Sequence, residues 1–346
     1  MDFSDTQTVS LGNTSFFTCS SLTGANLNNG QLTTIGNRVF ESTNMEYIEI
    51  PQPVSFMDYY CFRNCTNLKD INFSTNQLTE IKFNTFENSF HYGPNSITFP
   101  TSLNTIGSNA FKGSNISGVV DLSQTNLNSN DYGTFSYTPL LEGIKYPPSM
   151  KFVDRTGCAN SSIVWVSGSG LTGLHTGAFK DSVDFSGFIE APSGLPDSLR
   201  FIQDDVFVRC ASIKPRQNYL ISGNIESIGN FNWYQQASTQ SVIIHESFSG
   251  SIGDDNWSSV GNLGNLSIKF DNATASIGSR NWKDCDLISN VYIDCPYSVW
   301  VGTNNFDNAS NCDFFIKNTH HADYISNNWS GLQGVNAIST ISSYTP

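Results

Sequence analysis

Hydrophobic residues recur along this chain at a nearly constant spacing. An aliphatic residue, often followed by glycine, precedes an aromatic residue by five positions, as at Ile35 with Phe40 and Ile277 with Trp282. The repeats begin at Leu11, Ile35, Met57, Ile81, Ile106, Asn130, Val153, Leu174, Ile202, Ile228, Ile252, Ile277, Val301 and Tyr324. Their mean spacing is about 24 residues, and a fixed period of this length predicts a repeat array rather than separate globular domains.

A second pattern follows each aromatic residue at a fixed offset. Apolar residues stand six, nine and eleven positions after it, with polar residues between them, as in Leu68, Ile71 and Phe73. The alternation at the end of this pattern is typical of a short strand with one buried face. Proline often follows the strand, as at Pro51 and Pro100, where its missing N–H ends a hydrogen-bond ladder.

One turn of about 24 residues cannot bury these side chains alone, whereas stacked turns bury a continuous column. The pattern therefore predicts one solenoid of about 14 turns with short parallel strands, mostly β and irregular in structure. Residues 11–329 would form the repeats, and residues 1–10 and 330–346 would cap the two ends. The aromatic residues from Phe16 to Trp329 are expected to stack in a buried column, in which Cys158 replaces one ring.

The repeat resembles a known family. The pattern Leu-x-x-Ile-x-Ile-Pro…Ile-Gly-x-x-x-Phe-x-x-Cys-x-x-Leu, represented here by residues 45–51 and 62–68, is similar to the BspA-like (type 5) leucine-rich repeat. The resemblance covers most of residues 11–329 and is weakest around residues 117–170. It implies a leucine-rich-repeat solenoid. Such repeats occur in bacterial surface adhesins, protozoan surface proteins and some phage and large-virus proteins, so the resemblance also implies a binding or assembly surface rather than a reaction.

Composition narrows the possible functions. The chain has 17 Lys and Arg against 30 Asp and Glu, a net charge of −13, and 13% aromatic residues. The scarcity of good helix formers argues against an all-helical protein, and the aromatic content argues against disorder. An acidic chain without a basic run is a poor partner for nucleic acid. No apolar run reaches the 18 residues of a membrane helix, and the first residues do not form a secretory signal peptide.

The cysteines predict no disulfide framework. Cys19, Cys65, Cys210 and Cys285 each stand three residues after a repeat aromatic, and none of their repeats is adjacent to another. They are therefore too far apart to pair with one another, and we expect small buried side chains with free thiols.

No catalytic or metal-binding constellation emerges from the sequence. His320 and His321 lie on a segment expected to be extended, where neighbouring side chains point to opposite sides and suit a metal poorly. The open stack also lacks the deep pocket that would shift the pKa of a carboxyl group. We therefore expect no enzymatic activity, no cofactor and no metal.

The outward strand positions are the candidate binding surface. They alternate with buried positions, so they can vary without disturbing the stack. The candidate residues on this face are Tyr47, Glu49, Asp70, Asn72, Lys145, Ser267, Asn290 and Tyr292. A longer repeat interval contains a basic stretch with Lys214, Arg216 and Tyr219, which we predict to be a binding loop.

These features favour a non-enzymatic protein that binds a protein or glycan ligand. We expect it to act as an adhesion or receptor-binding module within a larger surface or virion assembly. Its neighbours in that assembly would be further copies of this chain, in a homo-oligomer, or other proteins of a virion or filament. A purely structural phage or virus component and a cytoplasmic protein-binding scaffold are the alternatives. Without a recognisable signal peptide, the expected location is a virion or cell surface as part of an assembly, or otherwise the cytoplasm.

Overall fold

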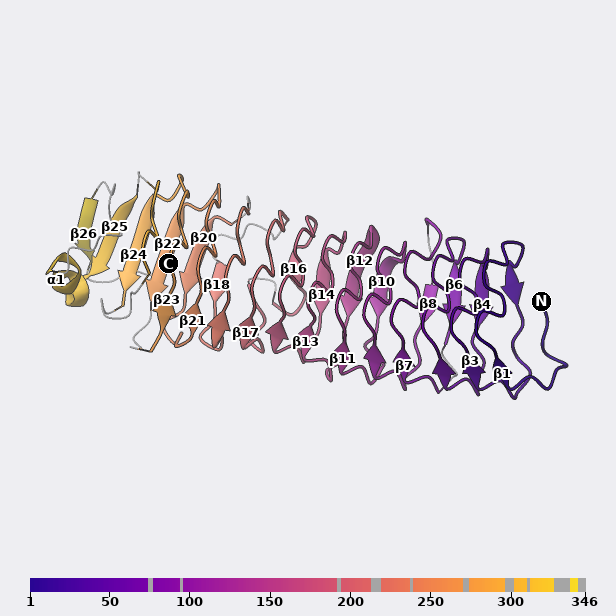
Figure 1. Ribbon diagram of the computed structural model, residues 1–346. Helices are drawn as coiled ribbons and strands as arrows, with labels where there is room; N and C mark the ends of the chain where they lie inside the picture. The colour runs from indigo at the N-terminus through magenta and orange to yellow at the C-terminus, as the bar shows by residue number, and fades with distance from the viewer. Residues whose placement is uncertain are drawn as a thin grey trace. The chain divides into compact units, whose positions relative to one another are not determined.

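The computed structural model describes residues 1–73, 77–93, 96–191, 194–212, 219–236, 239–269, 274–295, 302–309, 312–326 and 337–341. The chain divides into two compact units, Met1–Leu171 and Thr172–Pro346, called here the first and second units. Each unit is a leucine-rich-repeat solenoid of short parallel strands, which confirms the predicted fold class (Figure 1). Successive turns contribute strands to two columns, called A and B.

The described strand pairs of the first unit are parallel. Its A strands are β1 (Ser10–Leu11), β3 (Thr34–Ile35), β5 (Phe56–Met57), β7 (Glu80–Ile81), β9 (Thr105–Ile106), β11 (Ser129–Asn130) and β13 (Phe152–Val153). Its B strands are β2 (Gly24–Ala25), β4 (Tyr47–Glu49), β6 (Asp70–Asn72), β8 (Ser96–Thr98), β10 (Ser117–Asp121), β12 (Leu140–Lys145) and β14 (Trp165–Ser167).

The second unit repeats this arrangement and adds a helix. Its A strands are β15 (Gly173–Leu174), β17 (Phe201–Ile202), β19 (Ser227–Ile228), β21 (Ser251–Ile252) and β23 (Ser276–Ile277). Its B strands are β16 (Gly187–Phe188), β18 (Tyr219–Ile221), β20 (Ser241–Ile244), β22 (Asn265–Lys269), β24 (Asn290–Asp294), β25 (Asp313–Lys317) and β26 (Ala337–Ile341). Helix α1 (Asn318–Ser326) connects β25 to β26 and contacts both strands.

The B strands are those that the alternating pattern predicts, with Ile48 and Ile71 buried between outward residues. The A strands were not predicted. Each ends at the residue that opens a repeat, such as Ile35 or Ile277, whose side chain is buried. Two residues are too few to show a period, so the alternation that indicates a strand is absent there.

The aromatic column is confirmed within both units. In the first unit the rings of Phe16, Phe40, Phe62, Phe86, Phe111 and Phe135 stack in that order, with centroids 5.1–5.7 Å apart. In the second unit Phe179, Phe207, Trp233, Trp257, Trp282 and Phe306 stack with centroids 5.0–6.0 Å apart. Cys158 is buried, as expected, whereas Trp329 lies outside the described residues.

The segment around each aromatic residue forms a third hydrogen-bonded column. Arg38 and Ser42 flank Phe40 and have left-handed backbones, with φ of 55° and 58°. This conformation is unfavourable for residues with a side chain, so it needs compensation. The N–H groups of residues 38, 40 and 42 donate to the carbonyl oxygens of residues 59, 61 and 63 in the next turn, at 2.9–3.1 Å. These bonds recur from turn to turn and offset the local strain.

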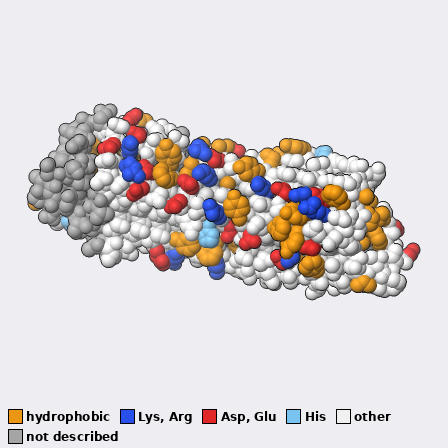
Figure 2. Space-filling model, viewed as in Figure 1, with side chains coloured by type: hydrophobic (Ala, Val, Ile, Leu, Met, Phe, Trp, Pro, Cys, Tyr) orange, Lys and Arg blue, Asp and Glu red, His pale blue; other side chains and the backbone are white. Residues whose placement is uncertain are grey.

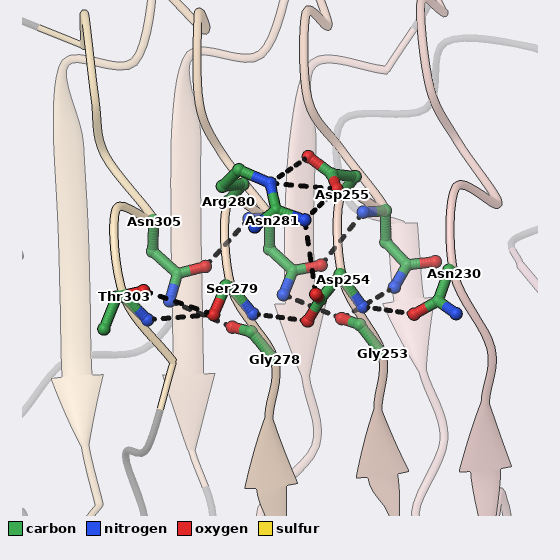
Figure 3. A network of polar contacts seen from close by, with 11 residues as sticks. Asn230, Gly253, Asp254, Asp255, Gly278, Ser279, Arg280, Asn281, Thr303 and Asn305 are labelled. Carbon is green, nitrogen blue, oxygen red and sulfur yellow. Dashed lines mark hydrogen bonds and ion pairs between the residues drawn. The ribbon is translucent and has the colours of Figure 1, made fainter.

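Asparagine side chains reinforce this column in the second unit (Figure 3). Asn256, Asn281 and Asn305 each precede a ring of the column and are fully buried. The Oδ1 atom of Asn281 accepts the N–H of Asn256 at 3.0 Å, and that of Asn305 accepts the N–H of Asn281 at 2.8 Å. The buried amides are therefore hydrogen-bonded between turns, which removes the cost of burying them.

Glycine at the position after the A strand lets successive turns approach closely. A Cβ atom at Gly253 would lie 2.4 Å from Asn230 Oδ1 and 2.8 Å from the carbonyl carbon of Gly229. That Asn230 Oδ1 accepts the N–H of Asp254 at 2.7 Å, so a side chain at Gly253 would displace a bond between turns. Real Cβ atoms do not tolerate such contacts, so the glycine is a packing requirement.

The chain departs from the predicted repeat near its end. Tyr324 and both His320 and His321 lie in helix α1 rather than in an extended repeat, so the prediction for this segment is wrong. Residues 318–326 lack glycine and proline, which would interrupt a helix. The position where the repeat was expected to begin holds Tyr324 and not an aliphatic residue. At the other end, Phe3 packs edge-on against Phe16, with ring centroids 6.0 Å apart.

The close approach at Gly253 predicts a position-specific cost of adding one methyl group. Gly253→Ala should lower the free energy of unfolding by about 1–3 kcal/mol, the usual range for overpacking. Gly261→Ala is the matched control, because nothing lies within 4 Å of a Cβ atom built there. Urea unfolding followed by tryptophan fluorescence measures both. Equal destabilisation of the two variants would contradict the packing requirement.

Candidate binding surface

Four of the predicted surface residues lie together in the first unit. The register pairs Tyr47 of β4 with Asp70 of β6, and Glu49 with Asn72, so two outward rows run across these strands. All four side chains are exposed, and Tyr47 retains 66% of its accessible surface. The inward residue of each strand holds the rows in place, because shifting the pairing by one residue would expose it.

Lys145 lies apart from these four residues, in the sheet that includes β10, β12 and β14. Its side chain is exposed, and its Nζ atom is 3.2 Å from Asp121 Oδ2 of the preceding turn. The predicted candidates therefore do not form one continuous site. An exposed ion pair of this kind contributes little to stability.

The second unit corrects the prediction for Ser267, which is only 2% exposed. Its register places it between Ile243 of β20 and Tyr292 of β24, whose side chains are much larger. The ring of Tyr292 stacks on Phe315 of β25 with centroids 5.0 Å apart, and both Tyr292 and Asn290 are half-buried. A small side chain pointing outward between large ones is not a free binding surface.

The predicted binding loop can be placed only in part. Lys214 and Arg216 lie outside the described residues. Tyr219 begins strand β18, and the register pairs its backbone with Val242 of β20. Tyr219 therefore belongs to the B column of the second unit rather than to a free loop.

The exposed rows of the first unit border a groove of about 650 Å³. It is lined by Met1, Asp2, Thr23, Gly24, Ala25, Asn26, Leu27, Asn28, Tyr47 and Glu49. Strand β2 contributes only Gly24 and Ala25 where β4 has Tyr47 and Ile48, so space opens beside Tyr47. The volume falls within the range of small-ligand sites, and the lining is mixed polar and apolar.

Sequence reasoning missed a second exposed cluster in the first unit. The rings of Tyr59 and Phe83 stack 4.2 Å apart, and the Lys82 ammonium lies 5.5 Å from the ring centre of Phe56. Lys82 also forms an ion pair with Glu80 at 2.6 Å. Figure 2 shows hydrophobic side chains beside Lys, Arg, Asp and Glu side chains on this view of the surface. The sequence did contain a signal for this cluster, because Tyr59 and Phe83 each stand two positions after the aliphatic residue that begins a repeat.

Polar residues replace the usual core residues where the repeat is weakest. Asn130 stands at an aliphatic position and Cys158 at an aromatic position, and both are buried together with Tyr146. Burial, together with the nearby carboxylate of Asp131, raises the pKa of the half-buried Asp154 carboxyl to about 7. Burial also raises the pKa of Tyr146 and of the Cys158 thiol. The Tyr146 and Cys158 side chains are thereby kept neutral in the core.

All eight cysteines are free thiols, and the prediction of burial is wrong only for Cys19, which is exposed. The Sγ atoms of Cys65, Cys210 and Cys285 donate to the carbonyl oxygens of Phe40, Phe179 and Trp257 in the preceding turn, at 2.9–3.0 Å. Burial raises the pKa of Cys65 to about 11 and that of Cys285 to about 12.

The described part of the chain holds neither a metal site nor a membrane-spanning helix. No three His, Cys, Asp or Glu side chains among those residues are arranged to hold a metal ion. Within the same residues, no helix combines the length and apolar character needed to cross a membrane.

A solenoid of stacked turns with an ordered outward strand face defines a leucine-rich-repeat protein. The sequence profile of the BspA type leucine rich repeat region, with six copies, matches residues 2–92, 90–186 and 191–321. The chain belongs to this family. Members of this class present a surface, and the fold is typically non-catalytic.

Solved structures of two other proteins are similar to this chain at low sequence identity. A leucine-rich repeat protein from Bacteroides ovatus is 18% identical, with a TM-score of 0.51, covering 90% of this chain and 88% of that one. The pneumococcal vaccine antigen PcpA is also 18% identical, with a TM-score of 0.49, covering 95% of this chain and 78% of that one. A comparison with curated proteins found no match.

The raised pKa of Asp154 predicts a pH-dependent stability. The folded state binds a proton at this carboxyl up to about pH 7, whereas an unperturbed Asp has a pKa of 3.8. Stability should therefore fall as pH rises from about 4 to about 7. Asp154→Asn should remove this loss and stabilise the protein at pH 8 by on the order of 2 kcal/mol.

Thermal unfolding at pH 4.5 and pH 8 tests the role of Asp154. Asp121→Asn is the control, because hydrogen bonds from Ser123 and the charge of Lys145 hold the pKa of Asp121 below its usual value. A difference between Asp154→Asn and wild type that does not change with pH would refute the assignment.

The cysteine environments predict distinct reactivities. An aromatic disulfide reagent added to the native protein without reductant should modify Cys19 alone, because the other seven thiols are buried. All eight should react after denaturation. Cys19→Ser should abolish the native reaction, and fewer than eight thiols in denaturant would show that a disulfide exists.

Proposed function

We propose that this protein is a non-catalytic adhesion or receptor-binding module, and that its ligand lies on the outward face of the B strands in the first unit. The proposed centre of the surface is Tyr47, Glu49, Asp70 and Asn72. We further propose that it acts as part of a larger surface or virion assembly. The observation that carries the proposal is the groove of about 650 Å³ bordered by two of these residues.

The exposed aromatic residue is the main support for binding. Tyr47 is 66% exposed although nothing in the core requires an aromatic residue at that outward position. Tyrosine is enriched among residues that dominate binding energies, because a rigid ring covers a large area at little entropic cost. Asp70 lies beside it in register and supplies a polar neighbour.

The construction of the face also suits a binding role. Outward residues alternate with Ile48 and Ile71, which are buried, so the surface can be specified independently of the core. Such a separation allows specificity to change while the array remains folded.

The proposal is tested by removing the surface without touching the core. The triple variant Tyr47→Ala, Glu49→Gln, Asp70→Asn should lose binding to whatever component of a glycan and surface-protein array the wild type recognises. The control triple variant Lys112→Gln, Tyr132→Ala, Tyr137→Ala changes half-buried or exposed side chains of the turns and should bind normally. Normal binding by the first variant would overturn the proposed surface.

A further inference from the structure

The groove in the first unit is built around one exposed ring. The register places Gly24 of β2 opposite Tyr47 of β4. A Cβ atom built at Gly24 would lie 3.8 Å from the Cζ atom of Tyr47, so the ring leans over the glycine. One part of the ring thus borders the groove while two thirds of the side chain remains open to solvent.

The groove is acidic. Asp2 and Glu49 line it, and the positive group among its lining residues is the amino group of Met1, which donates to the Gly24 carbonyl oxygen at 3.0 Å. The backbone N–H of Ser4 donates to Asp2 and lowers the pKa of that carboxyl, which is therefore ionised at neutral pH. No Lys, Arg or His side chain lines the groove.

Glu49 has no basic partner among the described residues, unlike Glu46 and Asp121 of the first unit. Glu46 pairs with Lys69 at 2.9 Å and Asp121 with Lys145 at 3.2 Å, each across successive turns. Glu49 stands two residues from Tyr47 on the same outward face of β4, so a carboxylate and an exposed ring flank the same space. A positive group placed there would contact both.

The chain already holds an ammonium group in this way elsewhere. Lys82 lies 5.5 Å and 5.7 Å from the ring centres of Phe56 and Tyr59, and its ammonium is 2.6 Å from Glu80 Oε2. Rings attract a cation through their negative faces, and the carboxylate adds a charge-assisted hydrogen bond. Tyr47 and Glu49 offer the same two groups without an internal lysine.

We propose that the groove beside Tyr47 receives a lysine or arginine side chain of a partner protein, with the Tyr47 ring and the Glu49 carboxylate as its recognition groups. This inference rests on the proposed function and names the partner chemistry of that surface. The net charge of −13 attracts basic partners over a longer range. An anionic ligand would meet two carboxylates and no basic side chain.

The experiment titrates the full chain with three probes at low ionic strength, monitored by NMR. The probes are the peptide acetyl-Gly-Lys-Arg-Lys-Gly-amide, the same peptide with both lysines acetylated and the arginine replaced by citrulline, and maltohexaose. The basic peptide should bind, its neutral form should bind at least tenfold more weakly, and maltohexaose should not bind. Added salt should weaken the binding of the basic peptide.

Matched variants assign the binding to this groove. Tyr47→Ala and Glu49→Gln should each weaken the basic peptide about three- to tenfold, whereas Tyr47→Phe should keep most of the affinity because the ring remains. Glu142→Gln removes an exposed carboxylate from β12 and should have little effect. Unchanged thermal unfolding of each variant shows that the fold is intact.

Three results would overturn the inference. These are equal binding of the basic and neutral peptides, equal effects of Glu49→Gln and Glu142→Gln, and binding of maltohexaose in place of the basic peptide, which would indicate a glycan site. If the inference fails while the triple variant at Tyr47, Glu49 and Asp70 still loses array binding, the proposed function stands. If array binding also survives in that variant, both proposals fail.

Discussion

The structure depends on hydrogen bonds that run between successive turns. Each turn donates backbone N–H groups to carbonyl oxygens of a neighbouring turn at the A strand, at the B strand and around the repeat aromatic residue. Bonds at three places around a turn fix the separation of neighbouring turns to about 4.8 Å, the spacing of paired strands. Every side chain must therefore fit against its counterparts one turn away.

This spacing determines which residue types can occupy each position. Flat rings stack at centroid distances near the turn spacing, as between Trp233 and Trp257 at 5.0 Å. An asparagine side chain can both accept and donate hydrogen bonds. The Oδ1 atom of Asn281 accepts the backbone N–H of Asn256, and the Nδ2 atoms of both residues donate to the carbonyl oxygen of Gly253, so both buried amides are hydrogen-bonded. Several charged residues form opposite pairs between turns, such as Arg280 with Asp255 at 2.6 Å, whereas stacked like charges would repel.

The same spacing explains what the sequence could predict. Large apolar residues repeat because each needs a counterpart in the next turn, so the period revealed the aromatic column and the B strands. Features that depend on a neighbour's size were not visible. Ser267 is buried by the larger residues beside it. The left-handed residues around each ring carry many side-chain types, including Arg38 and Ser42, since backbone bonds select their conformation.

Departures from the repeat are where special sites arise. A regular turn presents a filled face, because each outward side chain lies against its counterpart in the next turn. The groove exists where this regularity fails, since β2 offers Gly24 beside the large Tyr47. The core departs from the repeat in a comparable way at Asn130 and Cys158, which are buried at positions where other repeats have apolar residues. The Asp154 carboxyl, whose pKa is raised, lies in the same region. In most turns, each side chain packs against the equivalent side chain of the next turn. A side chain that has no such equivalent beside it is the one that can contact solvent, bind a proton or contact a partner.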